Sequence, residues 1–366
     1  MYISSFSEDS VNQTTTTTTT LNTVLKHSIC SFVRSQVLFV AVRLNLFTLI
    51  DQSPNHSLSY EEMKDYPISL SMLAYLVYLR LLKRSSDSHR YECTDVARTY
   101  LVCSRENYVG QGLGVWDYHR QYTFFLRLRE TLQYGIRTSE DSNEQVTLWS
   151  VLEHNHDPMI YFAKIMSAFT RCTISELCNR ADFSIYSTLL DIGGSLGDLS
   201  RTIVKQYPHI KAISFDLPEL TSYALSLPID HSNIDYIPGN FFEKWHSQIL
   251  DKFPEIDLIS LKYILHDWAH AQRAFLIEKV YQLLWKKIQI TGGNGTLLVI
   301  EKMIDPDRRN LTTLSTSVSM AIECGDGIGY DATQNEYEQL LIQAGFQRIQ
   351  SVQLTGPMVA LFAHVI

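Results

Sequence analysis

Two ionisable residues stand directly after apolar runs, where side chains are well placed for chemistry. His266 follows Leu-Lys-Tyr-Ile-Leu, and Glu301 follows Leu-Leu-Val-Ile. Ligands of open α/β sheets lie beyond the carboxyl ends of the strands. Histidine suits proton transfer near neutral pH, and a nearby carboxylate fixes its tautomer and stabilises the imidazolium. A lone histidine after a strand is more often structural, but its pairing with Glu301 predicts a general base.

A glycine cluster marks a second candidate site. The segment Asp191-Ile-Gly-Gly-Ser-Leu-Gly197 follows an apolar run and precedes a helical pattern, which predicts a strand, a tight turn and a helix. A dinucleotide fingerprint would need glycines where this chain has Gly193, Ser195 and Asp198, and an acid at the helix start disfavours a pyrophosphate. The cluster instead favours a cationic, phosphate-free nucleoside such as S-adenosylmethionine. A glycine turn without a ligand stays the alternative.

Two acids beside this turn suit such a nucleoside. Asp191 lies in the apolar run before the glycines, and Asp216 ends the next strand-like run. The carboxylate of Asp191 would favour the sulfonium and amino charges. That of Asp216 would accept hydrogen bonds from the two ribose hydroxyls.

Alternating elements beyond residue 187 must position these side chains. Strands are expected at 187–192, 210–215, 234–237, 256–261, 295–300 and 346–354, and helices at 198–206, 217–226, 271–287 and 334–344. This alternation predicts a doubly wound α/β domain. The turn signal Thr355-Gly-Pro357 predicts that the last strand returns antiparallel along the edge of the sheet.

The preceding residues predict a separate, mainly helical domain over 21–150, with the second domain over 151–366. Helical patterns at 21–43, 44–51, 59–65 and 69–82 precede a candidate hairpin at 84–94, which is the outline of a winged helix. A DNA-recognition helix needs polar side chains, but the 69–82 pattern is almost wholly apolar. It therefore favours burial in a core or a subunit interface over DNA binding. The Ser/Thr-rich residues 1–20 are expected to form a disordered tail.

Composition narrows the class of protein. The net charge of −8, from 31 Lys and Arg against 39 Asp and Glu, disfavours a general nucleic-acid binder. The six cysteines lack C-x-x-C spacing, which favours free thiols in a reducing compartment over metal ligands. No apolar run approaches the ~18 residues of a transmembrane helix, and no signal-peptide pattern is evident. The default expectation is a soluble cytoplasmic protein with no metal and no membrane or nucleic-acid partner.

Five motifs in one order carry a resemblance to a known family. They are Leu189-Leu-Asp-Ile-Gly-Gly-Ser-Leu-Gly197, Phe215-Asp-Leu-Pro218, Gly239-Asn-Phe-Phe242, Lys262-Tyr-Ile-Leu-His-Asp-Trp268 and Gln343-Ala-Gly-Phe346. With them, residues 158–366 resemble the class I, S-adenosylmethionine-dependent small-molecule O-methyltransferases, in the group of the plant caffeate, flavonoid and acetylserotonin enzymes. The resemblance implies a Rossmann-like domain with a mostly parallel seven-stranded sheet and an antiparallel edge strand. It also implies a winged-helix-like dimerisation domain and a homodimer.

The resemblance further implies roles for single residues. The residues that it implies for cofactor binding lie in the glycine cluster and after the next strands. They are Gly193, Gly197, Asp216, Asn240, Phe241 and Lys262, with Asp191 beside them. Those implied at the reacting centre are His266 as the base and Glu301 and Asp331 as its acids, with Phe125 and Met166 in the substrate pocket.

Three residues depart from the family pattern. Ser195 occupies the middle glycine position, and Asn240 replaces an aspartate that accepts from the adenine amino group. Asp331 stands for the glutamate of a Gly-Lys-Glu-Arg-Thr segment and is one methylene shorter, which puts its contact with His266 in doubt.

The expected reaction is attack of a substrate hydroxyl on the sulfonium methyl, with His266 taking the proton. A phenol of pKa ~10 and an ordinary histidine of pKa ~6.5 differ by roughly 3.5 units, about 5 kcal/mol, which positioning can absorb. An aliphatic alcohol would be much harder, so the expected acceptor is a phenolic or similar hydroxyl of a small aromatic metabolite. The alternatives are a relative acting on N or C, a catalytically silent subunit, and a winged-helix DNA-binding regulator.

Overall fold

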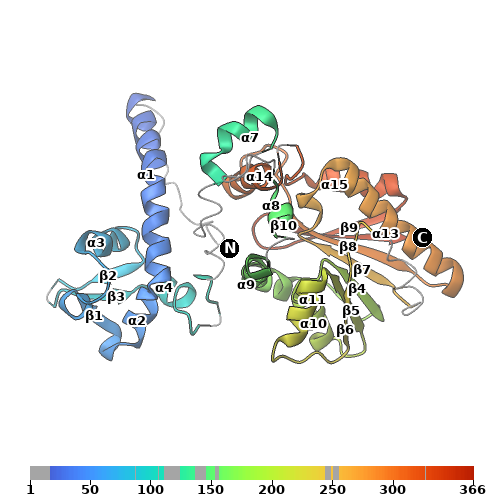
Figure 1. Ribbon diagram of the computed structural model, residues 1–366, viewed down its shortest axis with the longest axis horizontal. Helices are drawn as coiled ribbons and strands as arrows, with labels where there is room; N and C mark the ends of the chain where they lie inside the picture. The colour runs from blue at the N-terminus through green and yellow to red at the C-terminus, as the bar shows by residue number, and fades with distance from the viewer. Residues whose placement is uncertain are drawn as a thin grey trace. The chain divides into compact units, whose positions relative to one another are not determined.

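The computed structural model describes residues 17–86, 88–105, 107–110, 124–136, 146–152, 156–243, 249, 255–325 and 327–366 (Figure 1). Contacts divide the chain near residue 120 into two compact units, which are treated separately below. Residues 1–16 of the predicted tail lie outside the described residues.

The first unit combines four α-helices of the described chain with a small antiparallel sheet. The helices are α1 (Thr17–Arg43), α2 (Leu46–Gln52), α3 (Leu70–Tyr78) and α4 (Asp95–Tyr100), with single turns η1 (Pro54–His56) and η2 (Glu61–Met63). The strands are β1 (Ser57–Ser59), β2 (Leu82–Arg84) and β3 (Arg90–Cys93), in the order β1-β3-β2. The predicted hairpin is confirmed as β2 and β3. Helix α1 begins at Thr17, four residues inside the predicted tail.

One of the helix starts expected in this unit, at Ser69, forms as the sequence indicates. The side chain of Ser69 accepts a hydrogen bond from the backbone N–H of Met72 at the start of α3. Ser59 and Glu62 bond each other reciprocally, but the turn that follows is only the short η2 rather than the helix expected over 59–65. Helix α3 is likewise shorter than the predicted 69–82, because Arg80 adopts a left-handed φ of 57° that ends it before β2.

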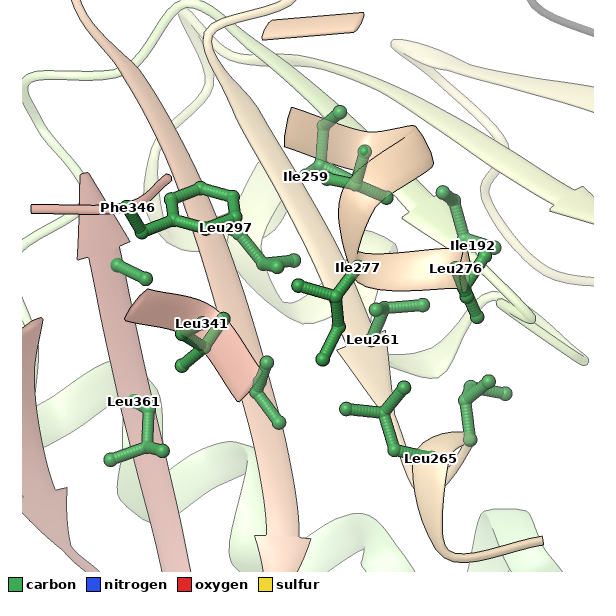
Figure 2. Close-up of a cluster of buried hydrophobic side chains, with 14 of the residues drawn as sticks. Ile192, Ile259, Leu261, Leu265, Leu276, Ile277, Leu297, Leu341, Phe346 and Leu361 are labelled. Carbon is green, nitrogen blue, oxygen red and sulfur yellow. The ribbon is translucent and has the colours of Figure 1, made fainter. Parts of the chain in front are cut away.

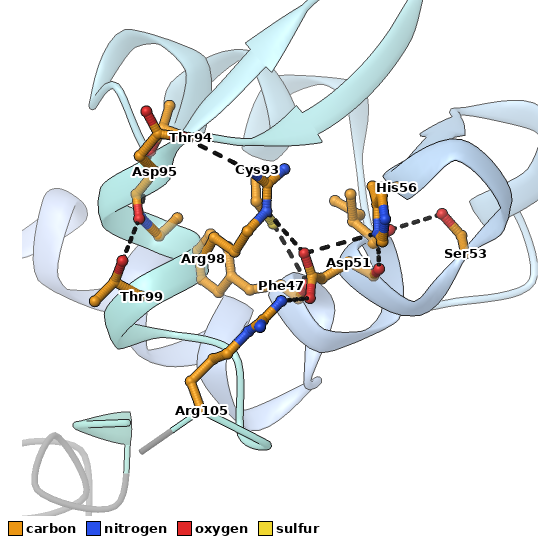
Figure 3. Close-up of polar contacts among 12 residues, drawn as sticks. Phe47, Asp51, Ser53, His56, Cys93, Thr94, Asp95, Arg98, Thr99 and Arg105 are labelled. Carbon is orange, nitrogen blue, oxygen red and sulfur yellow. Dashed lines mark hydrogen bonds and ion pairs between the residues drawn. The ribbon is translucent and has the colours of Figure 1, made fainter. Parts of the chain in front are cut away.

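A buried carboxylate joins the helices of the first unit (Figure 3). Asp51, near the end of α2, accepts hydrogen bonds from Arg98 of α4 at 2.9 Å and from Arg105 at 2.8 Å. Burial works to raise the pKa of Asp51, but the two guanidinium groups outweigh it and hold that pKa below its usual range. The carboxylate therefore stays ionised inside the unit and ties α2 to the segment after β3.

The second unit is a doubly wound α/β domain. Its helices are α7 (Leu128–Tyr134), α8 (Leu148–Leu152), α9 (His156–Arg180), α10 (Asp198–Gln206), α11 (Pro218–Ser226), α13 (His270–Thr291), α14 (Leu311–Cys324) and α15 (Gln334–Ala344), with the turn η3 (Leu265–Asp267). Its strands are β4 (Thr188–Ile192), β5 (Lys211–Asp216), β6 (Ile234–Pro238), β7 (Leu258–Lys262), β8 (Gly295–Lys302), β9 (Arg348–Gln353) and β10 (Met358–Val365).

The seven strands form one sheet in the order β6-β5-β4-β7-β8-β10-β9. The first five run parallel, and β10 inserts antiparallel between β8 and β9. The predicted fold class is thereby confirmed, with β10 as the returning strand; it lies one position inside the edge, which β9 occupies. Strand order reverses at β4, so the ends of β4, β5 and β7 enclose the crevice where such sheets bind ligands.

Apolar layers cover both faces of this sheet. One face packs against α13 and α15 through residues such as Ile259, Leu276, Leu297 and Leu341, which interdigitate in Figure 2. The other face packs against α9 and α10 through residues such as Ile174 and Leu199. Both faces are thus removed from water, which leaves the carboxyl ends of the strands as the place for polar chemistry.

The division near residue 120 places α7 and α8 in the second unit, where both contact α14. The domain boundaries predicted at 20 and 150 stay predictions. Within the described residues no single helix has the length and apolarity needed to cross a membrane. One bent pair, Cys30–Arg43 with Leu46–Gln52 at 51°, meets the length and composition criterion.

Candidate active site

The glycine turn after β4 is shaped by left-handed backbone. Gly193 has φ 70° and Gly197, the N-cap of α10, has φ 79°. A Cβ on Gly193 would overlap the side chain of Ile264, and one on Gly197 would lie 2.5 Å from the hydroxyl of Tyr236. Both positions therefore require glycine, for conformation and for space. Small residues here leave the backbone open to a ligand.

Ser195 fits this turn at a cost. It adopts φ 51°, a left-handed conformation that a residue with a Cβ rarely takes. Its backbone N–H donates to Oδ2 of Asp216 at 2.7 Å. Ser195 therefore replaces the family's middle glycine without breaking the turn, and its N–H links the turn to the acid at the end of β5.

Two acids lie under the turn. Asp191 is buried and accepts hydrogen bonds from Ser260 Oγ at 2.7 Å and Ser200 Oγ at 3.3 Å, while burial raises its pKa. Asp216 also accepts from the N–H of Leu217 at 2.7 Å. Burial raises the pKa of Asp216 to about 6, in spite of the hydrogen bonds that favour its ionised form.

Aromatic rings border the same crevice. Trp268 meets Phe241 and Phe242 edge-on, with ring centres 5.9 and 4.6 Å apart, and stacks on Trp149 of α8 at 6.2 Å with 13° between the planes. Asn240 precedes these phenylalanines, and its Oδ1 accepts from the N–H of Phe242 at 2.9 Å. One lone pair of that oxygen is thus engaged within the loop, which leaves the other for a ligand.

A buried lysine holds this loop in place. Lys279 of α13 donates through Nζ to the carbonyl of Phe241 at 3.0 Å and to the carbonyl of Glu243. Burial lowers the pKa of Lys279. Neither Lys279 nor Trp149 was predicted as a site residue, because their partners lie far away in the chain and no motif includes them.

Lys262 ends β7 beside the two acids. Burial lowers its pKa, against the charges of Asp191 and Asp198 that raise it. Its ammonium lies 5.7 Å from the ring centre of Tyr263. The side chain therefore lies near two acids of the crevice, and its place beside the cofactor stays a prediction.

His266 and Glu301 meet as the sequence predicts. The turn η3 carries His266 directly beyond β7, and its Nδ1 lies 2.6 Å from Oε2 of Glu301 at the end of β8. The other carboxylate oxygen accepts from the N–H groups of Ile264 and Leu265 at 3.0 and 2.8 Å. Glu301 is fully buried. Its carboxylate therefore fixes both the turn and the tautomer of the imidazole.

Charge sets the basicity of His266. Burial is the largest effect and lowers its pKa, but Glu301 and Asp267 together raise that pKa to about 9. The second ring nitrogen, Nε2, lies 3.2 Å from Oδ1 of Asp267. Burial raises the pKa of Asp267 to about 7. Asp267 is part of a recognised motif, but its role on Nε2 was not predicted.

Asp331 lies near this pair without bonding to it. Burial raises its pKa to about 6, and its charge contributes to the raised pKa of His266. Among the described residues its buried Oδ2 has no hydrogen-bond partner, and no hydrogen bond is recorded between its carboxylate and the imidazole. Asp331 thus acts on His266 through its field.

The two predicted pocket residues lie on or beside helices of the second unit. Met166 is half-buried on α9, and Phe125 is 37% exposed just before α7. No recorded contact joins either residue to His266, so their place in an acceptor pocket stays a prediction. Among the described residues, no group of three or more His, Cys, Asp or Glu could hold a metal ion.

The crevice fits the cofactor implied by the sequence. Six buried side-chain polar atoms have no hydrogen-bond partner within the described part of the chain, and three of them are the indole N–H groups of Trp149 and Trp268 and the hydroxyl of Ser214. Ser214 pairs in register with Asp191, and Trp268 borders the aromatic loop. The aromatic rings suit a purine, the acids suit a cation and ribose hydroxyls, and the unpaired donors suit polar atoms of a ligand. Together these groups match S-adenosylmethionine.

Comparisons with known proteins show which family the chain resembles. Residues 133–347 match the O-methyltransferase domain family, and residues 26–103 match the O-methyltransferase dimerisation domain. Acetylserotonin O-methyltransferase of Bos taurus is 28% identical over 358 residues, covering 93% of this chain and 97% of that protein. The N,N-dimethyltransferase OxyT of Streptomyces rimosus is 26% identical over 335 residues, covering 88% and 89%.

A solved structure extends the likeness to three dimensions. Human N-acetylserotonin methyltransferase in complex with S-adenosylmethionine superimposes with a TM-score of 0.81 at 25% identity, covering 96% of this chain and 99% of that one. The chain belongs to the O-methyltransferase family of S-adenosylmethionine-dependent, small-molecule methyltransferases.

Proposed function

We propose that this enzyme methylates a phenolic or similarly acidic hydroxyl of a small aromatic molecule, with His266 as the general base. The observation that carries the proposal is the buried bond between His266 Nδ1 and Glu301, which makes Nε2, 3.2 Å from Oδ1 of Asp267, the ring nitrogen that would take the proton. Bound S-adenosylmethionine supplies an electrophilic methyl group on its sulfonium. The chain's part is to hold cofactor and acceptor together and to remove one proton.

The raised basicity of His266 favours a phenol. With a histidine pKa of about 9, the gap to a phenol of pKa ~10 shrinks to about 1 unit, or ~1.4 kcal/mol. An aliphatic alcohol, with an acidity close to that of water at pKa ~15.7, would be about 7 units away, or roughly 9 kcal/mol. Proton removal is therefore nearly balanced for a phenol and strongly uphill for an alkyl alcohol.

The other site residues complete the proposal. We assign Gly193, Gly197 and Asp216 to the cofactor turn, and Asn240 and Phe241 to the adenine, with Asp191 and Lys262 beneath. Glu301 orients the base, and Asp331 adds a negative field behind it. Phe125 and Met166 would line the acceptor pocket, and the dimerisation domain would pair two copies of the chain.

A panel assay tests the acceptor class. The enzyme is incubated with S-adenosylmethionine carrying a labelled methyl group and with matched phenols, anilines and benzyl alcohols. We expect label on the phenols only. Transfer to the anilines alone would replace the proposal with N-methylation, and no transfer to any phenol would reject it.

Two histidine variants test the base. His266→Gln should lower kcat by about 10²–10⁴-fold while S-adenosylmethionine still binds, because general-base catalysis is worth that much. His270→Gln changes an exposed histidine four positions later and should leave kcat within twofold. Near-full activity of His266→Gln would refute the assignment of the base.

A further inference from the structure

A fully buried arginine lies next to the reacting centre without belonging to any predicted motif. Arg273, in the first turns of α13, has an exposed fraction of 0% and is among the largest fully buried side chains of the described chain. Arginine is almost never fully buried unless its charge and donors are engaged. Its contacts therefore indicate what this position does.

Two nitrogens of the guanidinium bond three backbone carbonyls around the histidine, while the third nitrogen, Nη1, is buried with no hydrogen-bond partner among the described residues. Nε donates to the carbonyl of Trp268 at 2.7 Å, and Nη2 donates to those of His266 at 3.3 Å and Tyr330 at 2.6 Å. The carbonyl of His266 also accepts from the N–H of Tyr330 at 2.9 Å. One side chain thus joins the turn that carries His266 and Asp267 to the segment that carries Asp331.

Ring stacking strengthens this link. The guanidinium carbon of Arg273 lies 3.8 Å from the ring centre of Tyr330, within the range of a cation–π contact. Tyr330 directly precedes Asp331, so the stacked ring fixes the backbone from which that carboxylate projects. A planar fork with aromatic stacking is specific to arginine, and a lysine cannot reproduce it.

We propose that Arg273 is a positioning residue for methyl transfer: its guanidinium clamps the His266–Trp268 turn to the Tyr330–Asp331 segment and so sets the geometry and the field around the imidazole. The inference rests on the proposed role of His266 as the base. It adds a residue from a third element, α13, to a centre built from the ends of β7 and β8.

The charge of Arg273 acts on the same groups. It works to lower the pKa of Asp267 and of Asp331, against the burial that raises both. The titratable and charged groups that face this centre are His266, Asp267, Tyr263, Glu301, Lys302, Tyr330, Asp331 and Tyr337. Within the described chain no carboxylate lies within ion-pair distance of the guanidinium. Removing its charge would therefore favour protonation of its neighbours, His266 included.

Two substitutions separate position from charge. Arg273→Lys keeps the cation and loses the fork, whereas Arg273→Met loses both at similar volume. Both should lower kcat, measured per S-adenosylmethionine-binding site, by about 10–100-fold, because small displacements at a reacting centre cost that much. Only Arg273→Met should shift the rising limb of kcat/KM against pH to higher pH. Affinity for S-adenosylmethionine should stay within twofold in both.

Lys287→Met provides the matched control. Lys287 is a buried cation at the other end of the same helix and donates to the carbonyl of Asn294. Its replacement should lower thermal stability without changing kcat or the pH profile. The comparison separates loss of a buried cation on α13 in general from loss of the clamp.

The imidazole pKa, read by NMR from the ring carbon-bound protons of His266 in the cofactor-bound enzyme, tests the inference without an acceptor. This pKa should rise in Arg273→Met and stay within about 0.3 units of the wild-type value in Arg273→Lys. The inference is overturned if Arg273→Met keeps the wild-type kcat and the wild-type rising limb of kcat/KM against pH. It is also overturned if Arg273→Lys no longer binds the cofactor, because Arg273 would then serve only to maintain the fold. If the wild-type enzyme methylates no phenol, the proposed function fails while this NMR titration still decides the clamp.

Discussion

At the scale of single residues, Glu301 determines what His266 can do. Burial alone would make the imidazole a weaker base than usual, yet its pKa lies at about 9 because Glu301 and Asp267 add negative charge at its two nitrogens. The same carboxylate holds the backbone of the turn through two N–H groups. One side chain thus supplies both orientation and charge.

Replacing that charge should move the pH profile. In Glu301→Gln the loss of the negative charge lets burial dominate, so the pKa of His266 falls below about 9. The rising limb of kcat/KM should shift to lower pH, while the plateau of kcat falls by about 10²-fold because the imidazolium loses its partner. Steady-state kinetics between about pH 5.5 and 10, in steps of about half a unit, measure both effects.

A second glutamate serves as the control for that variant. Glu278 lies on the exposed side of α13, where it accepts from Gln282. Glu278→Gln should leave both the limb and the plateau unchanged. A limb that stays in place in Glu301→Gln would contradict the account of the basicity of His266.

Ser195 offers a stability test at the cofactor turn. Its left-handed φ of 51° strains a residue with a Cβ, whereas glycine adopts that conformation freely. Ser195→Gly should therefore raise the free energy of unfolding by about 0.5–1 kcal/mol, after the added entropy of the unfolded chain is subtracted. Denaturant unfolding of the cofactor-free protein measures the change.

Ser226→Gly tests the opposite sign. Ser226 is the last residue of α11, where glycine has no conformational advantage, so this variant should be less stable than the wild type. A Ser195→Gly variant that is equally destabilised would show that the turn carries no strain at that position.

At the scale of elements, the ion-paired carboxylate of the first unit links two helices. Asp51→Asn removes the charge that Arg98 and Arg105 share and leaves two guanidinium groups over a neutral amide. Breaking a fully buried ion pair costs about 3–5 kcal/mol. Because both arginines are partly exposed to solvent, we expect the free energy of unfolding to fall by less, about 1–3 kcal/mol. Arg98 and Arg105 lie on and after α4, so that segment should lose protection first.

Hydrogen exchange with mass spectrometry measures that loss peptide by peptide. Asp95→Asn is the control, since its side chain is exposed and its ion pair with Arg98 spans 3.6 Å. Equal exchange of α2 and α4 in wild type and Asp51→Asn would exclude the linking role.

Many elements were predictable because their signals are local. Strand β4 and the glycine turn follow from an apolar run that stops at Gly193, and α15 follows from a capping box between Thr333 and Glu336. His266 and Glu301 were predictable as a pair because neighbouring parallel strands end at the same edge of a sheet. The residue types and the spacing carry enough information for such features.

Other elements depend on contacts that no local pattern records. Helix α14 was not predicted, since its first half is rich in Thr and Ser; it forms with Asn310 as its cap and with Met320 and Ile322 buried. Arg273 and Lys279 were not predicted as site residues because their carbonyl partners lie on distant segments. The contacts of Arg273 and of Lys279 with these carbonyls are therefore visible only in the tertiary structure.

At the scale of the whole molecule, the reacting centre influences stability. The pKa values of Asp216, Asp267 and Asp331 are raised to about 6, 7 and 6, and that of His266 to about 9. A group whose pKa is raised on folding binds its proton more tightly in the native state. Stability must then fall with rising pH between the unfolded and folded values.

This sign leads to a measurable trend. The contribution of His266 is complete below pH ~6.5 and is lost as pH rises through about 9, and the three aspartates lose theirs between pH ~4 and about 7. The thermal midpoint of the cofactor-free enzyme should therefore be higher near pH ~5.5 than near pH ~9. Calorimetry at three pH values in buffers of equal ionic strength measures it, and a midpoint that rises with pH would contradict these assignments.

The stacked indoles of Trp149 and Trp268 have an optical consequence. Their N–H groups are buried without partners and border the crevice that fits the cofactor. Indole emission depends on the polarity and hydrogen bonding around the ring, so filling the crevice should change the intrinsic fluorescence of this pair. The enzyme thus carries its own reporter, by which cofactor binding can be followed without a label.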